Sequence, residues 1–168
     1  VVRSVAAQPG RDTLANARLF ATVAQAMDDA LIAVMDAKYA YSLWRPVTAI
    51  RNGDIDGNDH TERDAAWTPM IETPLHPEYP CAHCILAATV ATVLKAEARQ
   101  RALPVLSTTS PTAQGAVRSW NSLDAFVQEV ALARIVGGVH YRHSTEVGQA
   151  MGQRIGEWAL HRSLAGAH

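Results

Sequence analysis

Apolar residues recur every three or four positions over most of this sequence, and this spacing is typical of helices with one buried face. Asp12 precedes the first such stretch, where its carboxylate can cap a helix. Ser144 or Thr145 is suited to cap the last one, which continues through Trp158. The predicted helices cover residues 12–36, 82–102, 122–139 and about 144–158. Because no stretch shows the alternation of a strand, the pattern predicts an all-α fold, a helical bundle around one core.

The length of 168 residues suits one domain with a real core, so we expect residues 1–168 to form a single all-α domain. The sequence starts at Val1 and not at a methionine, and we therefore expect a fragment of a longer chain. Packing against a missing N-terminal segment is one expectation for its surface, and a homodimer is the other.

The formal net charge of −1 excludes a general attraction to nucleic acid or to anionic membranes. No apolar run reaches the ~18 residues of a membrane-spanning helix. We therefore expect a soluble protein, cytoplasmic or periplasmic, with no nucleic acid partner and no membrane span. Any site for an anion has to be built locally.

Residues 52–80 are rich in turn formers and prolines and predict a long irregular segment. A loop of this length in a small domain is usually functional, so we expect an active-site loop. Its acidic residues suggest a calcium loop, but the glycine and the last carboxylate of that motif are missing, and a solvated acidic turn is favoured. These residues are Asp54, Asp56, Asn58 and Asp59.

Lys38 and Arg45 form the first of three polar clusters in apolar surroundings. Seven residues are two helical turns, so the two cations share a face if one helix continues through them. The alternative is a second segment with Pro46 in its first turn. Two surface cations would be the simplest interpretation, but Tyr41 and Trp44 nearby suggest partial burial, and a buried cation needs an anion.

The second cluster, residues 80–83, opens a predicted helix, whose free N–H groups and dipole favour an anion. His83 on that turn can exchange protons with a bound group, or can serve as a capping or core histidine. Cys81 and Cys84 are most simply two small apolar residues, because no redox or haem pattern surrounds them. A zinc site with His140 and His143 is the less favoured alternative.

The third cluster runs from Arg134 to His140 with two glycines between them. Glycines late in a helix cost about 1 kcal/mol each relative to alanine, so they loosen the helix or let another backbone or a ligand come close. A neutral imidazole at His140 can attack phosphorus or coordinate a metal-oxide centre. Taken singly, a histidine at a helix end with no such role is equally acceptable.

Together, the clusters resemble the superfamily of vanadium-dependent haloperoxidases and type 2 phosphatidic acid phosphatases. Its pattern is K-x6-R-P, then P-S-G-H, then S-R-x5-6-H-x3-D. This chain has the first part complete, then Pro-Cys-Ala-His at 80–83, then Ala-Arg, five residues and a histidine at 133–140. The resemblance covers about residues 36–160. The Trp44 context and the five-residue gap resemble the haloperoxidase branch more than the membrane-embedded lipid phosphatases.

The resemblance implies a role for each matching residue. His140 would be the vanadate ligand, or the nucleophile toward phosphate, and His83 would be the acid/base. The remaining oxygens of the oxyanion would be held by three cations and by backbone N–H groups. These oxyanion-binding residues are Lys38, Arg45, Arg134, Cys81 and Ala82.

Three positions depart from the family pattern. Cys81 replaces a serine, Ala82 replaces a glycine, and Ser144 stands where an aspartate would orient His140. Glu146 can take over the missing carboxylate only if the turn allows it.

The resemblance implies an enzyme with vanadate as cofactor that oxidises halide with hydrogen peroxide. The first alternative is a phosphatase that hydrolyses phosphate monoesters through a phosphohistidine, since phosphate fits the same site. The second alternative is a non-catalytic oxyanion-binding protein. In each case the partner is a small-molecule substrate or an oxyanion.

Overall fold

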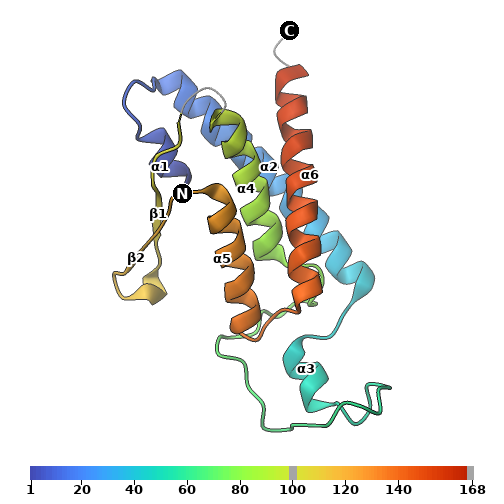
Figure 1. The fold of residues 1–168 in the computed structure, drawn as a ribbon. Coiled ribbons are helices and arrows are strands. Elements are labelled where there is room, and N and C mark those ends of the chain that lie inside the picture. The colour runs from blue at the N-terminus through green and yellow to red at the C-terminus, as the bar shows by residue number, and fades with distance from the viewer. Residues whose placement is uncertain (99–101, 166–168) are drawn as a thin grey trace.

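The computed structural model describes residues 1–98 and 102–165 and contains a bundle of four long helices (Figure 1). The prediction of an all-α bundle is confirmed. Within the described residues, no helix is both long enough and apolar enough to cross a lipid bilayer. The four helices are α2 (Thr13–Tyr41), α4 (Ala82–Ala98), α5 (Leu123–Val136) and α6 (Arg142–Ala165).

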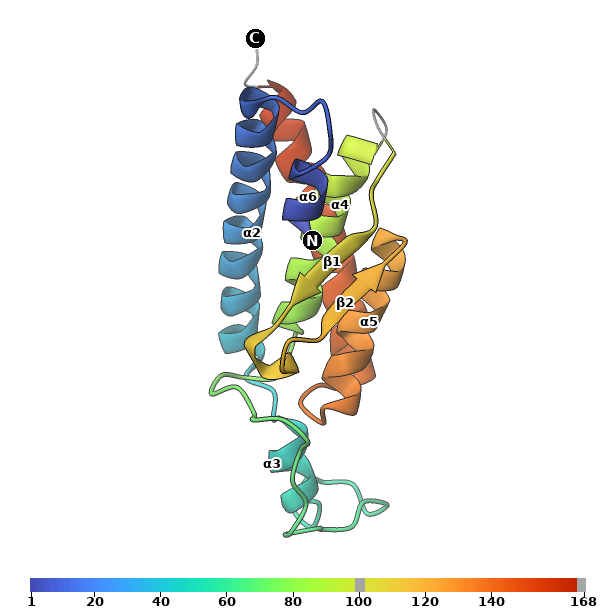
Figure 2. The same cartoon turned by 90° about the vertical axis from the view of Figure 1, so that its left-hand side faces the viewer.

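Helix α4 is the central element of the bundle, and the other three long helices pack around it (Figures 1 and 2). Its sequence is apolar on nearly every face, which is typical of a helix that is surrounded by others. Its buried side chains are mostly small or β-branched, so neighbouring helices approach it closely. They include Ile85, Ala87, Ala88, Val90, Ala91, Val93 and Leu94.

The contact between α4 and α6 depends on a row of glycines. Gly148, Gly152 and Gly156 are four residues apart and therefore lie on one face of α6. A Cβ atom at Gly148 would lie 2.8 Å from the carbonyl oxygen of Cys81, the residue directly before α4. A Cβ at Gly152 would overlap the carbonyl oxygen of Ile85. These glycines let the two helix backbones come together.

A β-hairpin follows α4, where the sequence pattern predicted no strand. Strand β1 (Leu106–Thr109) pairs antiparallel with β2 (Val117–Trp120), and Leu106 lies opposite Trp120. That prediction was wrong because each strand is too short to show an alternating pattern, and the pair is stabilised by burying Leu106 and Trp120 in the core. A short 3-10 helix, Pro111–Ala113, makes the turn.

The chain breaks between α2 and the short α3 (Pro46–Arg51). Ser42 adopts a left-handed conformation with φ 46° and ends α2, and Arg45 is the N-cap of α3. One helix continuing through Lys38 and Arg45 was therefore wrong, and a new segment with Pro46 in its first turn is confirmed. The physical reason is that proline disfavours helical backbone in the residue before it and is well tolerated at a helix start.

Two other helix boundaries differ from the prediction. A short helix, α1 (Val2–Ala6), precedes the bundle. Helix α6 begins at Arg142, so Ser144 and Thr145 lie inside its first turn and do not cap it. The Ser144 hydroxyl is engaged elsewhere, in the site described below.

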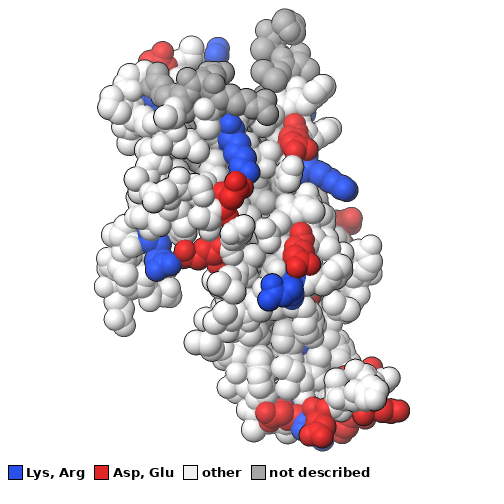
Figure 3. All heavy atoms as spheres, viewed as in Figure 1, with Lys and Arg blue, Asp and Glu red and all other residues white. Residues whose placement is uncertain are grey.

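Residues 52–80 contain no helix or strand, as predicted, and extend with α3 beyond one end of the bundle (Figure 1). Exposed acidic side chains gather at the far end of this segment (Figure 3). There the Asp56 carboxylate accepts hydrogen bonds from the Thr61 hydroxyl and the Asn58 amide. These local bonds are typical of a polar turn.

Candidate functional site

The three clusters meet at one end of the bundle, next to α3. The C-terminal ends of α2 and α5 and the N-terminal ends of α4 and α6 all lie there (Figure 1). Lys38 and Arg134 occupy the last turns of α2 and α5, where a positive charge complements the helix dipole. Arg45 joins the clusters directly, because its Nη1 donates to the carbonyl oxygen of Val139 at 2.7 Å.

Lys38 is completely buried, and its ammonium group is fully used by the backbone. Nζ donates to the carbonyl oxygens of Pro77, Glu78 and Pro80 at 2.9, 2.8 and 2.6 Å. Burial, and next the positive charge of Arg45, lower the pKa of Lys38 to about 8. Lys38 therefore holds the end of the 52–80 segment in place and contributes positive charge to the site.

Arg45 holds both the 52–80 segment and the α5–α6 connection. Its Nε donates to the carbonyl oxygen of His76 at 3.1 Å, and Nη2 lies 3.1 Å from Nδ1 of the same residue. Its Nη1 lies 3.1 Å from Nε2 of His140. Because a guanidinium only donates, Nε2 of His140 is the acceptor in its contact with Arg45.

His140 is buried and neutral. Its Nδ1 lies 2.7 Å from Oε1 of Glu78, and this nitrogen carries the proton because Nε2 accepts from Arg45. Burial lowers the pKa of His140 to about 4 even though the neighbouring Glu78 acts in the opposite direction. The imidazole thus keeps a lone pair on Nε2, which a nucleophile or a metal ligand requires.

Glu78 is the site residue that sequence reasoning missed. Its side chain is fully buried, and its carboxylate accepts hydrogen bonds from His140, from the Tyr141 amide at 3.0 Å and from the Ser144 hydroxyl at 2.5 Å. Burial raises its pKa, but these hydrogen bonds together lower it below the ordinary value. The available signal was a single carboxylate within the proline-rich run 73–80.

Glu146, considered as a substitute for the missing aspartate, is exposed on α6. Ser144, at the position of that aspartate, donates to Glu78 instead. The carboxylate that contacts His140 thus comes from the 52–80 segment, and the two residues are 62 positions apart in the sequence.

Arg134 has an unpaired donor. Its Nε is buried and finds no hydrogen-bond partner within residues 1–98 and 102–165. The charged groups that act on Lys38 are Arg45, Arg134 and a single carboxylate, Glu78. The cluster therefore holds two more positive charges than negative ones. A surplus of this kind, with a free donor, favours an anion.

The glycine pair before His140 lets another part of the chain come close. Gly138 has φ 75°, and a Cβ there would lie 3.0 Å from the ring of Trp67 and 3.2 Å from Pro69. The Met70 amide donates to the carbonyl oxygen of Gly137 at 3.1 Å. Of the two explanations for these glycines, close approach of another backbone is confirmed.

The start of α4 carries the second cluster. Cys81 and Cys84 are joined in a disulfide, which corrects the interpretation of two independent apolar residues and leaves neither sulfur free for zinc. The Cys81 amide donates to the carbonyl oxygen of Ser144 at 3.1 Å. Ala82 is buried in the first turn, whose amides have no partner within the helix. No group of three or more potential metal-ligating side chains occurs in the described part of the chain.

His83 is the histidine of the site that solvent can reach. Its side chain is exposed to solvent, in contrast to His140. Partial burial, and next the positive charge of Arg134, lower the pKa of His83 to about 4. An accessible, neutral histidine beside a cationic cluster can accept a proton from an incoming molecule.

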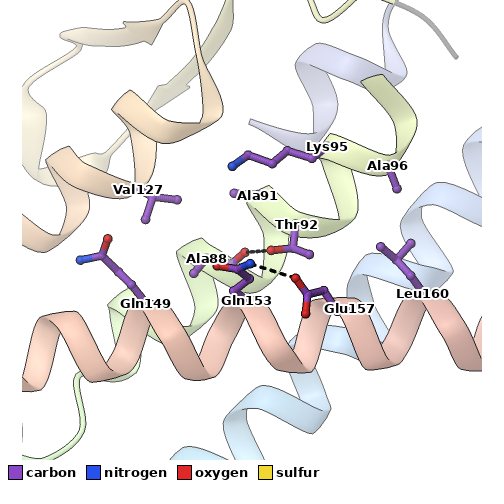
Figure 4. Close-up of a pocket in the computed structure, with 10 residues that line it drawn as sticks. All are labelled: Ala88, Ala91, Thr92, Lys95, Ala96, Val127, Gln149, Gln153, Glu157 and Leu160. Carbon is purple, nitrogen blue, oxygen red and sulfur yellow. Dashed lines mark hydrogen bonds between the residues drawn. The ribbon is translucent and has the colours of Figure 1, made fainter. Parts of the chain in front are cut away.

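A separate groove of about 310 Å³ lies between α5 and α6 over α4 (Figure 4). Several of its polar side chains are paired: Lys95 contacts Asp124 at 2.6 Å, and Gln153 donates to Glu157 at 2.9 Å. None of the histidines or arginines of the three clusters lines it. The cationic cluster is therefore the better candidate for chemistry.

Comparison with known proteins adds an independent finding. A family model described as the VCPO second helical-bundle domain matches residues 18–166. A search of curated proteins finds no match.

Three solved structures are similar to this chain. The first, titled as the first bacterial vanadium-dependent iodoperoxidase, has 28% sequence identity and a TM-score of 0.81, over 95% of this chain and 37% of that one. A holo-type bacterial vanadium-dependent chloroperoxidase has 20% identity and a TM-score of 0.68, over 86% and 35%. An apo-type structure of such a chloroperoxidase has 18% identity and a TM-score of 0.76, over 94% and 38%. This chain thus spans little more than a third of their length.

Proposed function

Because this chain belongs to the family of VCPO second helical-bundle domains, we propose that its cationic cluster binds vanadate and serves the oxidation of halide by hydrogen peroxide. The observation that carries the proposal is the buried Nε of Arg134, which lacks a partner within the described residues and sits in a cluster with surplus positive charge. A tetrahedral oxyanion supplies both the missing acceptor and the missing negative charge.

The residues present fit such a group. Arg134 offers a free donor, and Arg45 and Lys38 contribute charge, with Arg45 close enough to His140 to act on the same ligand. The first turn of α4, at Ala82, adds backbone N–H groups at a positive helix end. In this proposal Nε2 of His140 would be the protein ligand to vanadium and would give up its hydrogen bond from Arg45 on binding.

Vanadate, when bound, supplies a Lewis-acidic centre that activates peroxide toward halide. The overall reaction takes up one halide ion, one hydrogen peroxide and one proton and yields hypohalous acid and water. Two electrons pass from the halide to the peroxide as its O–O bond breaks. His83, exposed and neutral, is our candidate for moving the proton.

Iodide is the first halide to test, because the similar structure with 28% identity is titled an iodoperoxidase. The purified chain would be loaded with orthovanadate and mixed with iodide and hydrogen peroxide, and triiodide formation followed by absorbance, with bromide in parallel. His140→Ala is expected to abolish vanadate-dependent turnover. His161→Ala, an exposed position near the other end of α6, is the matched control and is expected to change nothing.

The other outcomes separate the alternatives. Tight vanadate binding without turnover would refute the peroxidase proposal and leave an oxyanion-binding domain. Hydrolysis of a phosphate monoester with competitive inhibition by vanadate would identify a phosphatase. Failure of both vanadate and phosphate to bind, measured by calorimetry, would refute the oxyanion site itself.

A further inference from the structure

We infer that Glu78 is the positioning residue of His140 and that it does this together with Ser144. The carboxylate holds the proton on Nδ1 of His140 and thereby keeps the lone pair on Nε2 for the oxyanion. The effect of Glu78 on the affinity for an oxyanion rests on the proposed function. The tautomer of His140 does not depend on it, because it follows from contacts within the protein.

The tautomer follows from two contacts that agree. Arg45 can only donate, so its Nη1, 3.1 Å from Nε2, requires a bare nitrogen there. Glu78 as a carboxylate can only accept, so its Oε1, 2.7 Å from Nδ1, requires a proton there. One tautomer satisfies both neighbours, and the opposite one satisfies neither.

The carboxylate is itself held from several directions. Oε1 also accepts from the Tyr141 amide, and Oε2 accepts from the Ser144 hydroxyl. Its backbone amide donates to the carbonyl oxygen of Leu43 at 3.0 Å, and its own carbonyl accepts from Lys38. The backbone bonds to α2 and to the α2–α3 connection fix the position of residue 78. The side chain can then turn away from His140 only by also breaking its bonds to Tyr141 and Ser144.

Ser144 links this arrangement to the family pattern. The pattern places an aspartate four residues after the histidine, and this chain has Ser144 at that position. The serine hydroxyl is too short to replace the carboxylate, but it donates to the one that residues 52–80 supply. Glu78 and Ser144 together therefore form the acidic partner of the imidazole, in which Ser144 holds one carboxylate oxygen and His140 contacts the other.

Such a partner raises the basicity of the opposite ring nitrogen and fixes its direction. Removing a hydrogen-bonded partner of a ligating histidine typically lowers metal affinity or activity about 10- to 100-fold. Glu78→Gln keeps the shape and an acceptor for Nδ1 but removes the charge. Glu78→Ala removes both, and Ser144→Ala removes only the anchor.

The direct test is the tautomer of His140 in the ligand-free wild-type protein, read from long-range ¹H–¹⁵N correlations of the imidazole. We expect a protonated Nδ1 and a bare Nε2. A proton on Nε2 would overturn the inference without any variant and without any vanadate, so its failure is distinguishable from that of the proposed function.

The variants test the consequence. Vanadate binding is measured by calorimetry, with inorganic phosphate as second probe and Glu129→Gln, on α5 away from the cluster, as matched control. For Glu78→Ala we expect vanadate to bind about 10- to 100-fold more weakly and both tautomers of His140 to be populated. For Glu78→Gln we expect a smaller loss of affinity and a single tautomer. Ser144→Ala is expected to lose an amount of affinity between those of the two Glu78 variants. If Glu78→Ala does not fold, Glu78→Gln decides: an unchanged Kd in a folded Glu78→Gln protein would overturn the role of the charge.

Discussion

Replacing Gly152 by alanine is expected to destabilise this protein, although alanine is the better helix former. Gly152 lies where α6 meets α4 most closely, and Thr89 donates to its carbonyl oxygen at 3.0 Å. An added Cβ would lie 2.9 Å from Cβ of Ala88 and 3.0 Å from the carbonyl carbon of Ile85, and it would overlap the oxygen of that carbonyl. Because backbone atoms cannot rotate aside, the two helices have to move apart.

The expected size follows from two opposing terms. Overpacking a close contact costs about 1–3 kcal/mol, and a clash with backbone belongs at the upper end of that range. Alanine recovers about 1 kcal/mol of helix propensity relative to glycine. The net loss in the free energy of unfolding is therefore about 2 kcal/mol, which lowers Tm by about 4–8 °C for a chain of this size.

Urea unfolding followed by circular dichroism measures this difference. Ala150→Gly, at an exposed position of the same helix, reports helix propensity alone and is expected to lose about 1 kcal/mol. If Gly152→Ala were as stable as the wild type, or more stable, the close approach of α4 and α6 would be refuted.

Three further predictions concern protonation, buried donors and capping. The unfolded chain protonates His140 near pH 6.5 and the folded chain only near 4, so this residue alone takes away about 3 kcal/mol of stability as pH falls from 6.5 to 4. The lowered pKa of His83 acts in the same direction, and a flat series of urea midpoints over that range would contradict the prediction. Lys38→Met leaves the carbonyl oxygens of Glu78 and Pro80 without their donor, while that of Pro77 keeps Arg45, and it is expected to cost roughly 3 kcal/mol. The exposed Lys95→Met is expected to change little, and thermal unfolding measures both variants. Asp12→Ala removes the acceptor for the Ala15 amide at the start of α2 and is expected to cost about 1 kcal/mol, whereas equal stability in urea would show that this cap contributes nothing.

Most of the bundle could be predicted because helix spacing and breakers act locally. The start of α4 and both ends of α5 agree with the periodic stretches at 82–102 and 122–139 to within a few residues, and residues 99–101 of the first stretch lie outside the described part of the chain. The hairpin was missed because its stability comes from distant contacts. Leu106 and Trp120 are buried against other parts of the core, and nothing in a strand of four residues signals this in advance.

The sequence predicted which residues belong to the candidate site better than it predicted the contacts between them. Lys38, Arg45, Arg134 and His140 were expected together, and they lie at one end of the bundle. Lys38 gives all its hydrogens to backbone carbonyl oxygens, however, which no spacing rule indicates.

Sequence alone specifies where the helices run and which cations and histidines form the cluster, because helical spacing and short motifs are local properties of the chain. It does not specify which carboxylate faces His140. Glu78 reaches that ring only because Lys38, Arg45 and Ser144 hold the end of the 52–80 segment against α6. Contacts between residues so far apart depend on how the elements pack, and packing is decided by the whole core at once.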